Sequence, residues 1–227
     1  MTVAEFINKV GFKVDQSSVT KVNNTINDIK SRAAKMLSAI GVGISLTAIN
    51  ALVEEFGAAN QQIQSAVGEL ENMTDVQDLV LEKANEARLA YNDMAGYVSN
   101  LVKAGADIFP VDDAMQFTST VAKLMKTSGR NDSQIASMME GFNKSFQKGI
   151  VDSETLNKML EQAPETANIL ADSLGVAKSQ LLTMASEGTM TVQQLKAAFM
   201  DSSGAIDAAF SQMDMSVTDA LKNVRNK

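Results

Sequence analysis

The chain has 227 residues, a net charge of −7 and 45% hydrophobic residues, which is apolar enough for a folded core and excludes a disordered protein. It contains no cysteine and no histidine, so disulfides, Cys/His zinc sites and histidine acid–base chemistry are excluded. Two prolines and two tyrosines accompany fourteen methionines, and this composition favours helix over sheet.

The first predicted element is a short strand. "VGFKVD" (residues 10–15) alternates apolar and polar side chains, with Val10, Phe12 and Val14 on one side. No other segment predicts a strand. The first fifteen residues lack a basic stretch followed by an apolar one, so a cleaved secretory signal is not predicted.

Residues 18–40 carry a heptad pattern, and Ser17 and Ser18 offer helix caps before it. Apolar residues recur in alternating steps of three and four, the spacing of a coiled-coil seam. The seam consists of Val19, Val22, Ile26, Ile29, Ala33, Met36 and Ile40. Two interpretations remain open: an amphipathic helix packed on its own domain, or a coiled coil between chains. Valine and isoleucine at both kinds of seam position favour three or more strands.

Residues 36–53, "MLSAIGVGISLTAINALV", carry no charge and only just reach the length that crosses a bilayer. Ala39 and Gly43 would allow close contact between helices. We interpret the segment as a buried or oligomer-interface helix, with a membrane-active segment as the alternative. The apolar residues that would enter a membrane are Ile40, Val42, Ile44, Leu46, Ile49, Leu52 and Val53.

The next helical signals are regularly spaced caps and stops. Thr74 and Gln77 form a capping box that begins a helical stretch to Gly105, interrupted near Ala90. The caps expected after it are Asp112 or Asp113, Asn131 or Asp132, and Asp152, and the expected stops are Gly129 and Gly149. The expected buried faces are Phe117, Val121 and Leu124, and then Ile135, Met138, Met139, Phe142 and Phe146.

Residues 151–199 continue this punctuation with four short helices. The expected first helix carries Leu156, Met159, Leu160 and Ala163 on one face. Pro164 ends it and suits the first turn of the next, and Thr191 with Gln194 forms a second capping box. The structural marker positions are Leu156, Leu160, Pro164, Leu174, Gly175, Leu181, Gly188 and Thr191. Helices this short are unstable alone, so we predict an all-α fold, a compact bundle of short helices preceded by a longer heptad-patterned helix.

The sequence contains no motif for catalysis. It has neither a phosphate-binding glycine loop nor a G-x-S-x-G nucleophile turn. Ser18 and Lys21 fit S-x-x-K, but the companion motifs are missing. We expect no enzyme activity, no cofactor and no catalytic or metal-binding residue. No basic stripe with interleaved aromatic residues occurs, so direct nucleic-acid binding is not expected.

Four segments stand out by their order and spacing: "LNKMLEQAP", "LADSLGV", "MASEGTMT" and "LKAAF". With these segments, residues 75–200 resemble the N-terminal tape-measure domain of bacteriophage and prophage tails. Ala177 stands where that family usually has a Ser or Thr cap, which costs one helix cap. The "VGFKVD" opening and the uncharged segment resemble the start of such proteins more weakly.

The resemblance implies a structural virion protein in the lumen of the tail, present in the host cytoplasm during assembly. Such proteins determine tail length by templating the tube, with a few copies, the tail tube protein and tail assembly chaperones as partners. Some also act at the host membrane. The alternatives from the residues are an oligomeric helical scaffold or adaptor, and a membrane-active protein that uses residues 36–53.

We expect three parts in the chain: an N-terminal segment with the heptad and uncharged helices (1–72), a tape-measure-like helical domain (73–203), and the helical start of a downstream region (204–227). A molecular ruler needs an extended helix, whereas this chain is interrupted every ten to twenty residues after Asn72. We therefore expect a folded end of a longer protein that anchors or nucleates, and not the ruler.

The heptad pattern predicts that residues 18–40 hold three or more chains together. An Ile26→Asp, Ile29→Asp double variant would bury unpaired charges in the seam, and it should dissociate the assembly. Sedimentation of both proteins measures this, with circular dichroism to check that residues 75–200 stay helical. A monomeric wild-type chain at tens of micromolar would show instead that the seam packs on its own chain.

Overall fold

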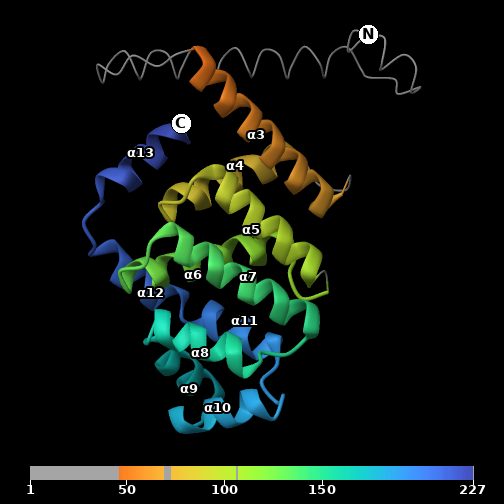
Figure 1. Cartoon of the computed structure of the whole chain (residues 1–227), viewed down its shortest axis with the longest axis vertical. Helices are drawn as coiled ribbons and strands as arrows, with labels where there is room; N and C mark the ends of the chain where they lie inside the picture. The colour runs from red at the N-terminus through yellow and green to blue at the C-terminus, as the bar shows by residue number, and fades with distance from the viewer. Residues whose placement is uncertain (1–45, 69–72, 106, 227) are drawn as a thin grey trace. The chain divides into compact units, whose positions relative to one another are not determined.

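The computed structural model describes residues 46–68, 73–105 and 107–226, and these residues form eleven helices and no strand (Figure 1). The predicted all-α fold is therefore confirmed. The strand predicted at 10–15 and the heptad helix predicted at 18–40 lie outside the described residues.

The helices are α3 (Leu46–Val67), α4 (Met73–Glu86), α5 (Tyr91–Ala104), α6 (Val111–Thr127), α7 (Asp132–Lys148), α8 (Ser153–Gln162), α9 (Thr166–Leu174), α10 (Lys178–Ser186), α11 (Val192–Asp201), α12 (Ser203–Ser211) and α13 (Val217–Arg225). Contacts between residues divide the chain into two compact units. One of them, Gly57–Asn226, contains α4 to α13. The expected three-part division stays a prediction.

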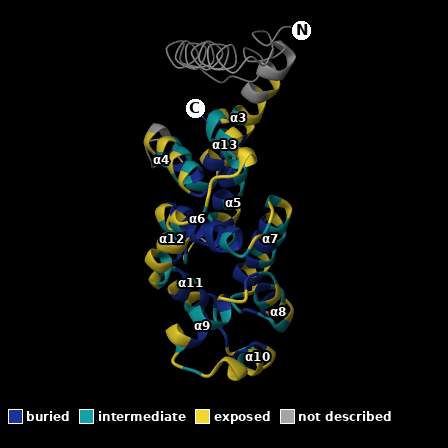
Figure 2. Cartoon of the chain, turned by 90° about the vertical axis from the view of Figure 1, so that its left-hand side faces the viewer, coloured by how far each residue is buried: buried dark blue, intermediate teal, exposed yellow. Residues whose placement is uncertain are grey.

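Helix α6 is the centre of the unit Gly57–Asn226. Thirteen of its seventeen residues are buried, and α4, α5, α7, α11 and α12 all pack against it. Figure 2 shows α6 in dark blue among helices whose outer faces are exposed. A helix buried on all sides occurs in the core of a protein and cannot be a surface element.

Five phenylalanine rings fill the space around this helix. Phe117 lies in their middle, with its ring centroid 5.3–5.7 Å from the rings of Phe109, Phe142, Phe146 and Phe199. All four contacts are edge-to-face, which is a favourable geometry for aromatic pairs. Because the rings come from α6, α7, α11 and the loop before α6, one cluster joins these elements.

Three of the expected caps are present. Asn131 accepts a hydrogen bond from the Gln134 backbone N–H (3.0 Å), and Asp152 accepts one from that of Thr155 (2.9 Å). Thr191 and Gln194 form the expected reciprocal capping box. These bonds satisfy backbone donors that a helix N-terminus leaves without an internal partner.

The expected cap of α6 was wrong. Pro110 occupies the N-cap position with an extended backbone, so Asp112 and Asp113 lie in the first turn of the helix. Helix α6 begins earlier because Val111 is buried in the core. The two carboxylates still face the positive end of the helix dipole, which favours them there.

Two other expected boundaries differ slightly. Helix α4 begins at Met73, so Thr74 lies inside its first turn, and the interruption near Ala90 is present between α4 and α5. Pro164 lies in the turn between α8 and α9 and not within α9. In that turn, the Thr166 backbone N–H donates to the carbonyl of Ala163 (2.9 Å).

Between α7 and α11 the chain runs away from the core and back, and we call this segment, which contains α8 to α10, the excursion. Two backbone hydrogen bonds close this excursion, from Val151 N–H to Met190 O (2.9 Å) and from Val192 N–H to Gly149 O (3.3 Å). Gly149 has a φ of 77°, which only glycine adopts without strain, and it turns the chain out of α7. These two hydrogen bonds hold the start and the end of the excursion side by side.

The marker positions are distributed as follows. Leu156 and Leu181 are buried, Leu160 and Leu174 are half-buried, Pro164 is exposed, Gly175 and Gly188 have positive φ angles, and Thr191 is the cap of α11. Helix α10 follows Ala177, where only the Gln180 side chain accepts from the Ala177 N–H (3.0 Å). Ala177 therefore provides no side-chain acceptor for the N-terminus of α10, unlike the Ser or Thr expected at this position.

Replacing Leu156 by Ala should lower the free energy of unfolding by about 2–5 kcal/mol, because the side chain is fully buried and its loss leaves a cavity. Leu182→Ala is the matched control, since this leucine is 42% exposed, and its effect should stay below about 0.5 kcal/mol. Denaturant unfolding of both variants measures the difference. Equal effects would show that the face of α8 is misassigned.

Candidate functional site

Two features of the unit Gly57–Asn226 can support an interaction. The described residues contain no group of three or more acidic side chains placed to hold a metal ion. Membrane crossing would need a longer apolar helix than any in the described part of the chain. The first feature is the set of contacts that hold residues 207–226 against the core. The second is a groove beside α9.

The first feature, which we call the C-terminal latch, consists of residues 207–226 and their partners. Lys126 of α6 is buried, and its Nζ lies 2.8 Å from Asp219 Oδ1 of α13. Lys222 of α13 contacts Asp132 of α7 (Nζ–Oδ2, 2.6 Å). A buried ammonium requires a counter-charge, so these pairs position α13 against α6 and α7.

The local charges shift two pKa values in the latch. Partial burial alone would raise the pKa of Asp219, but hydrogen bonds from Lys126, Ser216 and Lys222 outweigh it and lower the pKa. Burial would likewise lower the pKa of Lys222, but Asp132 and Asp219 raise it overall. Both groups therefore favour their charged forms in the folded protein.

A second anchor is the buried side chain of Asn226. Its Oδ1 accepts a hydrogen bond from the Tyr91 backbone N–H (2.9 Å). Its Nδ2 donates to the backbone carbonyl of Leu89 (2.9 Å) and to the side-chain oxygen of Asn85 (3.1 Å). One asparagine thus satisfies polar groups exposed by the break between α4 and α5.

Arg88, which lies between α4 and α5, also contacts the C-terminal latch. It has a φ of 55°, and its guanidinium donates to the carbonyls of Met213 and Asp214, both at 2.9 Å. It also lies over the ring of Phe210, 4.4 Å from the centroid, in a cation–π contact. Buried Lys123 of α6 pairs with Asp207 of α12 (2.7 Å).

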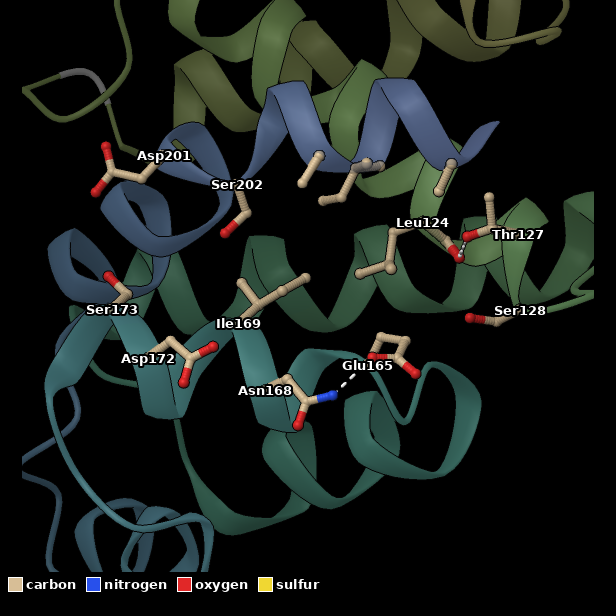
Figure 3. Close-up of a pocket in the computed structure, with 13 residues that line it drawn as sticks. Leu124, Thr127, Ser128, Glu165, Asn168, Ile169, Asp172, Ser173, Asp201 and Ser202 are labelled. Carbon is tan, nitrogen blue, oxygen red and sulfur yellow. Dashed lines mark hydrogen bonds between the residues drawn. The ribbon is translucent and has the colours of Figure 1, made fainter. Parts of the chain in front are cut away.

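The second feature is a groove with a volume of about 710 Å³ between the end of α6, α9 and α12 (Figure 3). Leu124, Ile169 and Ile206 form its apolar floor, together with two alanines of α12. Glu165, Asp172 and Asp201 line it with carboxylates, and its lining includes no lysine or arginine. This volume is within the usual range of ligand-binding clefts.

A family profile described as tape measure protein matches residues 47–227, which is most of the chain. The chain belongs to the tape measure protein family. No curated protein and no solved structure shows a significant match. The matched range includes the predicted region 75–200, and it also covers the latch and the groove. The protein is therefore a structural protein of the phage tail.

The sequence-predicted interface residues of this tape measure protein are not tested. Val19, Val22, Ile26, Ile29, Ala33, Met36 and Ile40 lie outside the described residues, as do Val42 and Ile44. Leu46, Ile49, Leu52 and Val53 lie in α3, in a part whose side chains are not described. Both sets of candidates stay predictions.

Sequence reasoning missed the latch and the groove. Ser216 is a recognisable cap of α13, but nothing in the sequence pairs Asn226 with a break more than 130 residues earlier. The groove had a weak signal, because Ile169 and Asp172 of α9 follow its N-cap residue Glu165 at helical spacing. The sequence of one helix does not show which distant helix forms the opposite wall of the groove.

Replacing Asp219 by Asn should lower the free energy of unfolding by about 1–3 kcal/mol at neutral pH, because buried Lys126 loses its nearest counter-charge. The folded-state pKa of Asp219 is lowered, so its contribution is complete above the ordinary carboxyl pKa and is lost as the pH falls through the folded-state value. The difference between variant and wild type should therefore shrink below about pH 4. Denaturant unfolding over this pH range measures it.

Glu140→Gln is the control, because Glu140 pairs with Lys144 on the exposed surface of α7 and should not change the unfolding midpoint. A difference for Asp219→Asn that does not depend on pH would mean that the charge of Asp219 is not what stabilises α13.

Proposed function

We propose that this tape measure protein acts in tail length determination and tail assembly inside the tail tube. The family match over residues 47–227 carries the proposal, since it covers the whole helical unit from α4 to α13. The partners that fit this role are further copies of the chain, three or more in number, the tail tube protein and tail assembly chaperones. The host membrane is a further candidate.

Within that role, the unit Gly57–Asn226 acts as a folded body and not as the ruler. A ruler converts residue number into length at about 1.5 Å per residue along an uninterrupted helix. The helices α4 to α13 have at most 17 residues each and pack around α6. This compactness supports an anchoring or nucleating function, in which another part of the protein measures the length.

The experiment is a tail-length measurement in the phage or prophage that encodes the chain. Leu156→Asp places a charge in the core and should abolish the folded unit, so tails should be absent or of abnormal length. Leu182→Asp changes an exposed leucine in the same way and should leave tail number and length unchanged. Electron microscopy of the particles provides the count and the length distribution.

Normal tails from Leu156→Asp particles would contradict the proposal and favour the scaffold or adaptor alternative. A second arm tests the partners, because the tagged chain should co-purify with the tail tube protein during assembly. Leakage of liposomes caused by residues 36–53, together with normal tails in the variant phage, would favour the membrane-active alternative.

A further inference from the structure

The carboxylates of the groove lack the lysine partners that some other carboxylates of the same unit have. Asp132, Asp207 and Asp219 each pair with a buried or half-buried lysine. In the described part of the chain, Glu165, Asp172 and Asp201 form no ion pair with lysine or arginine. These three exposed carboxylates therefore have no lysine or arginine partner, although the Asn168 side chain donates a hydrogen bond to Glu165 Oε2 (2.7 Å).

Two of these carboxylates also occupy positions that are unfavourable for the fold. Asp172 lies in the last turn of α9, and Asp201 is the last residue of α11. Negative charges near a helix C-terminus are repelled by the dipole of that helix. Ser128 at the end of α6 also lines the groove, which adds the negative end of another helix. The lining of the groove thus contains three carboxylates and no basic residue.

The spacing of the charges defines the shape of a matching ligand. Glu165, the N-cap residue of α9, and Asp172 in its last turn are seven residues apart, which is about two turns or 10.5 Å along the helix axis. Half-buried Ile169 lies between them, and Asp201 at the end of α11 also lines the groove, with its carboxylate turned away from the other two (Figure 3). A helix with lysine or arginine two turns apart, and apolar residues between them, repeats the same spacing.

We propose that the groove binds a basic amphipathic helix of a partner protein. Its apolar residues would pack on Ile169 and Ile206, and its cations would lie against Glu165, Asp172 and Asp201. An amphipathic helix in an apolar groove is a common mode of peptide recognition. The proposal rests on the groove alone and does not depend on a role in tail length.

The test uses the purified 227-residue chain and a synthetic amphipathic helix of about 14 residues, with leucine on one face and lysines two turns apart on the other. A peptide with glutamate in place of lysine is the matched ligand control. The methyl resonances of Ile169 and Ile206 should shift on binding, while that of Ile135, buried in α7, should not. The glutamate peptide should not bind.

Charge reversal separates the groove from general attraction to an acidic protein. The Glu165→Lys, Asp172→Lys, Asp201→Lys triple variant should weaken binding of the lysine peptide about tenfold or more, because it replaces attraction between opposite charges with repulsion between like charges. The control is a triple variant of exposed carboxylates outside the groove, Asp78→Lys, Glu82→Lys and Glu154→Lys, with the same change in net charge. It should weaken binding less than about threefold.

A neutral variant covers the case in which charge reversal disturbs folding. Ala205→Gln adds a longer uncharged side chain to the exposed groove side of α12, so it should weaken peptide binding severalfold without altering charge. Equal weakening by both triple variants would overturn the proposal, as would binding that shifts neither Ile169 nor Ile206. Equal binding of the glutamate peptide, or the same methyl shifts with spermine alone, would also overturn it.

Discussion

The burial of α6 on all sides is the constraint from which the arrangement of the described helices follows. A helix with so few exposed residues needs cover around its whole circumference, and no single neighbour can supply it. The cover comes from α4 and α5 before it, α7 directly after it, and α11 and α12 much later in the chain. Phe117 connects most of this cover through its ring contacts.

The same helix carries two buried lysines, and these determine how the chain's end is held. An ammonium group in the core is costly unless a carboxylate reaches it, and here Asp207 and Asp219 do so from α12 and α13. Asn226 and Arg88 add hydrogen bonds at the break between α4 and α5. The latch therefore joins the start and the end of the unit through charge and polar satisfaction, with no fully buried side chain in α13 itself.

The groove is a consequence of the excursion formed by α8 to α10. Both ends of the excursion are fixed, because α7 and α11 contribute rings to the phenylalanine cluster and the backbone bonds at Val151 and Val192 close its base. Helix α9 then lies against α11, with α12 across the groove from it. For a tape measure protein, this provides a rigid surface on a compact body, which suits the recruitment of a partner.

The sequence by itself determined the family resemblance, the all-α class and most local boundaries. The caps at Asn131, Asp152 and Thr191 and the stop at Gly149 were predictable because each depends on residues within three or four positions. The start of α6 was mispredicted because burial of Val111 outweighed the capping preference of Asp112 and Asp113. Only the tertiary structure decided which lysines are buried, what Asn226 binds and that Asp201 lines the same groove as Glu165 and Asp172. These features join residues far apart in the chain, and the side-chain pattern of one helix contains no information on which distant helix will face it.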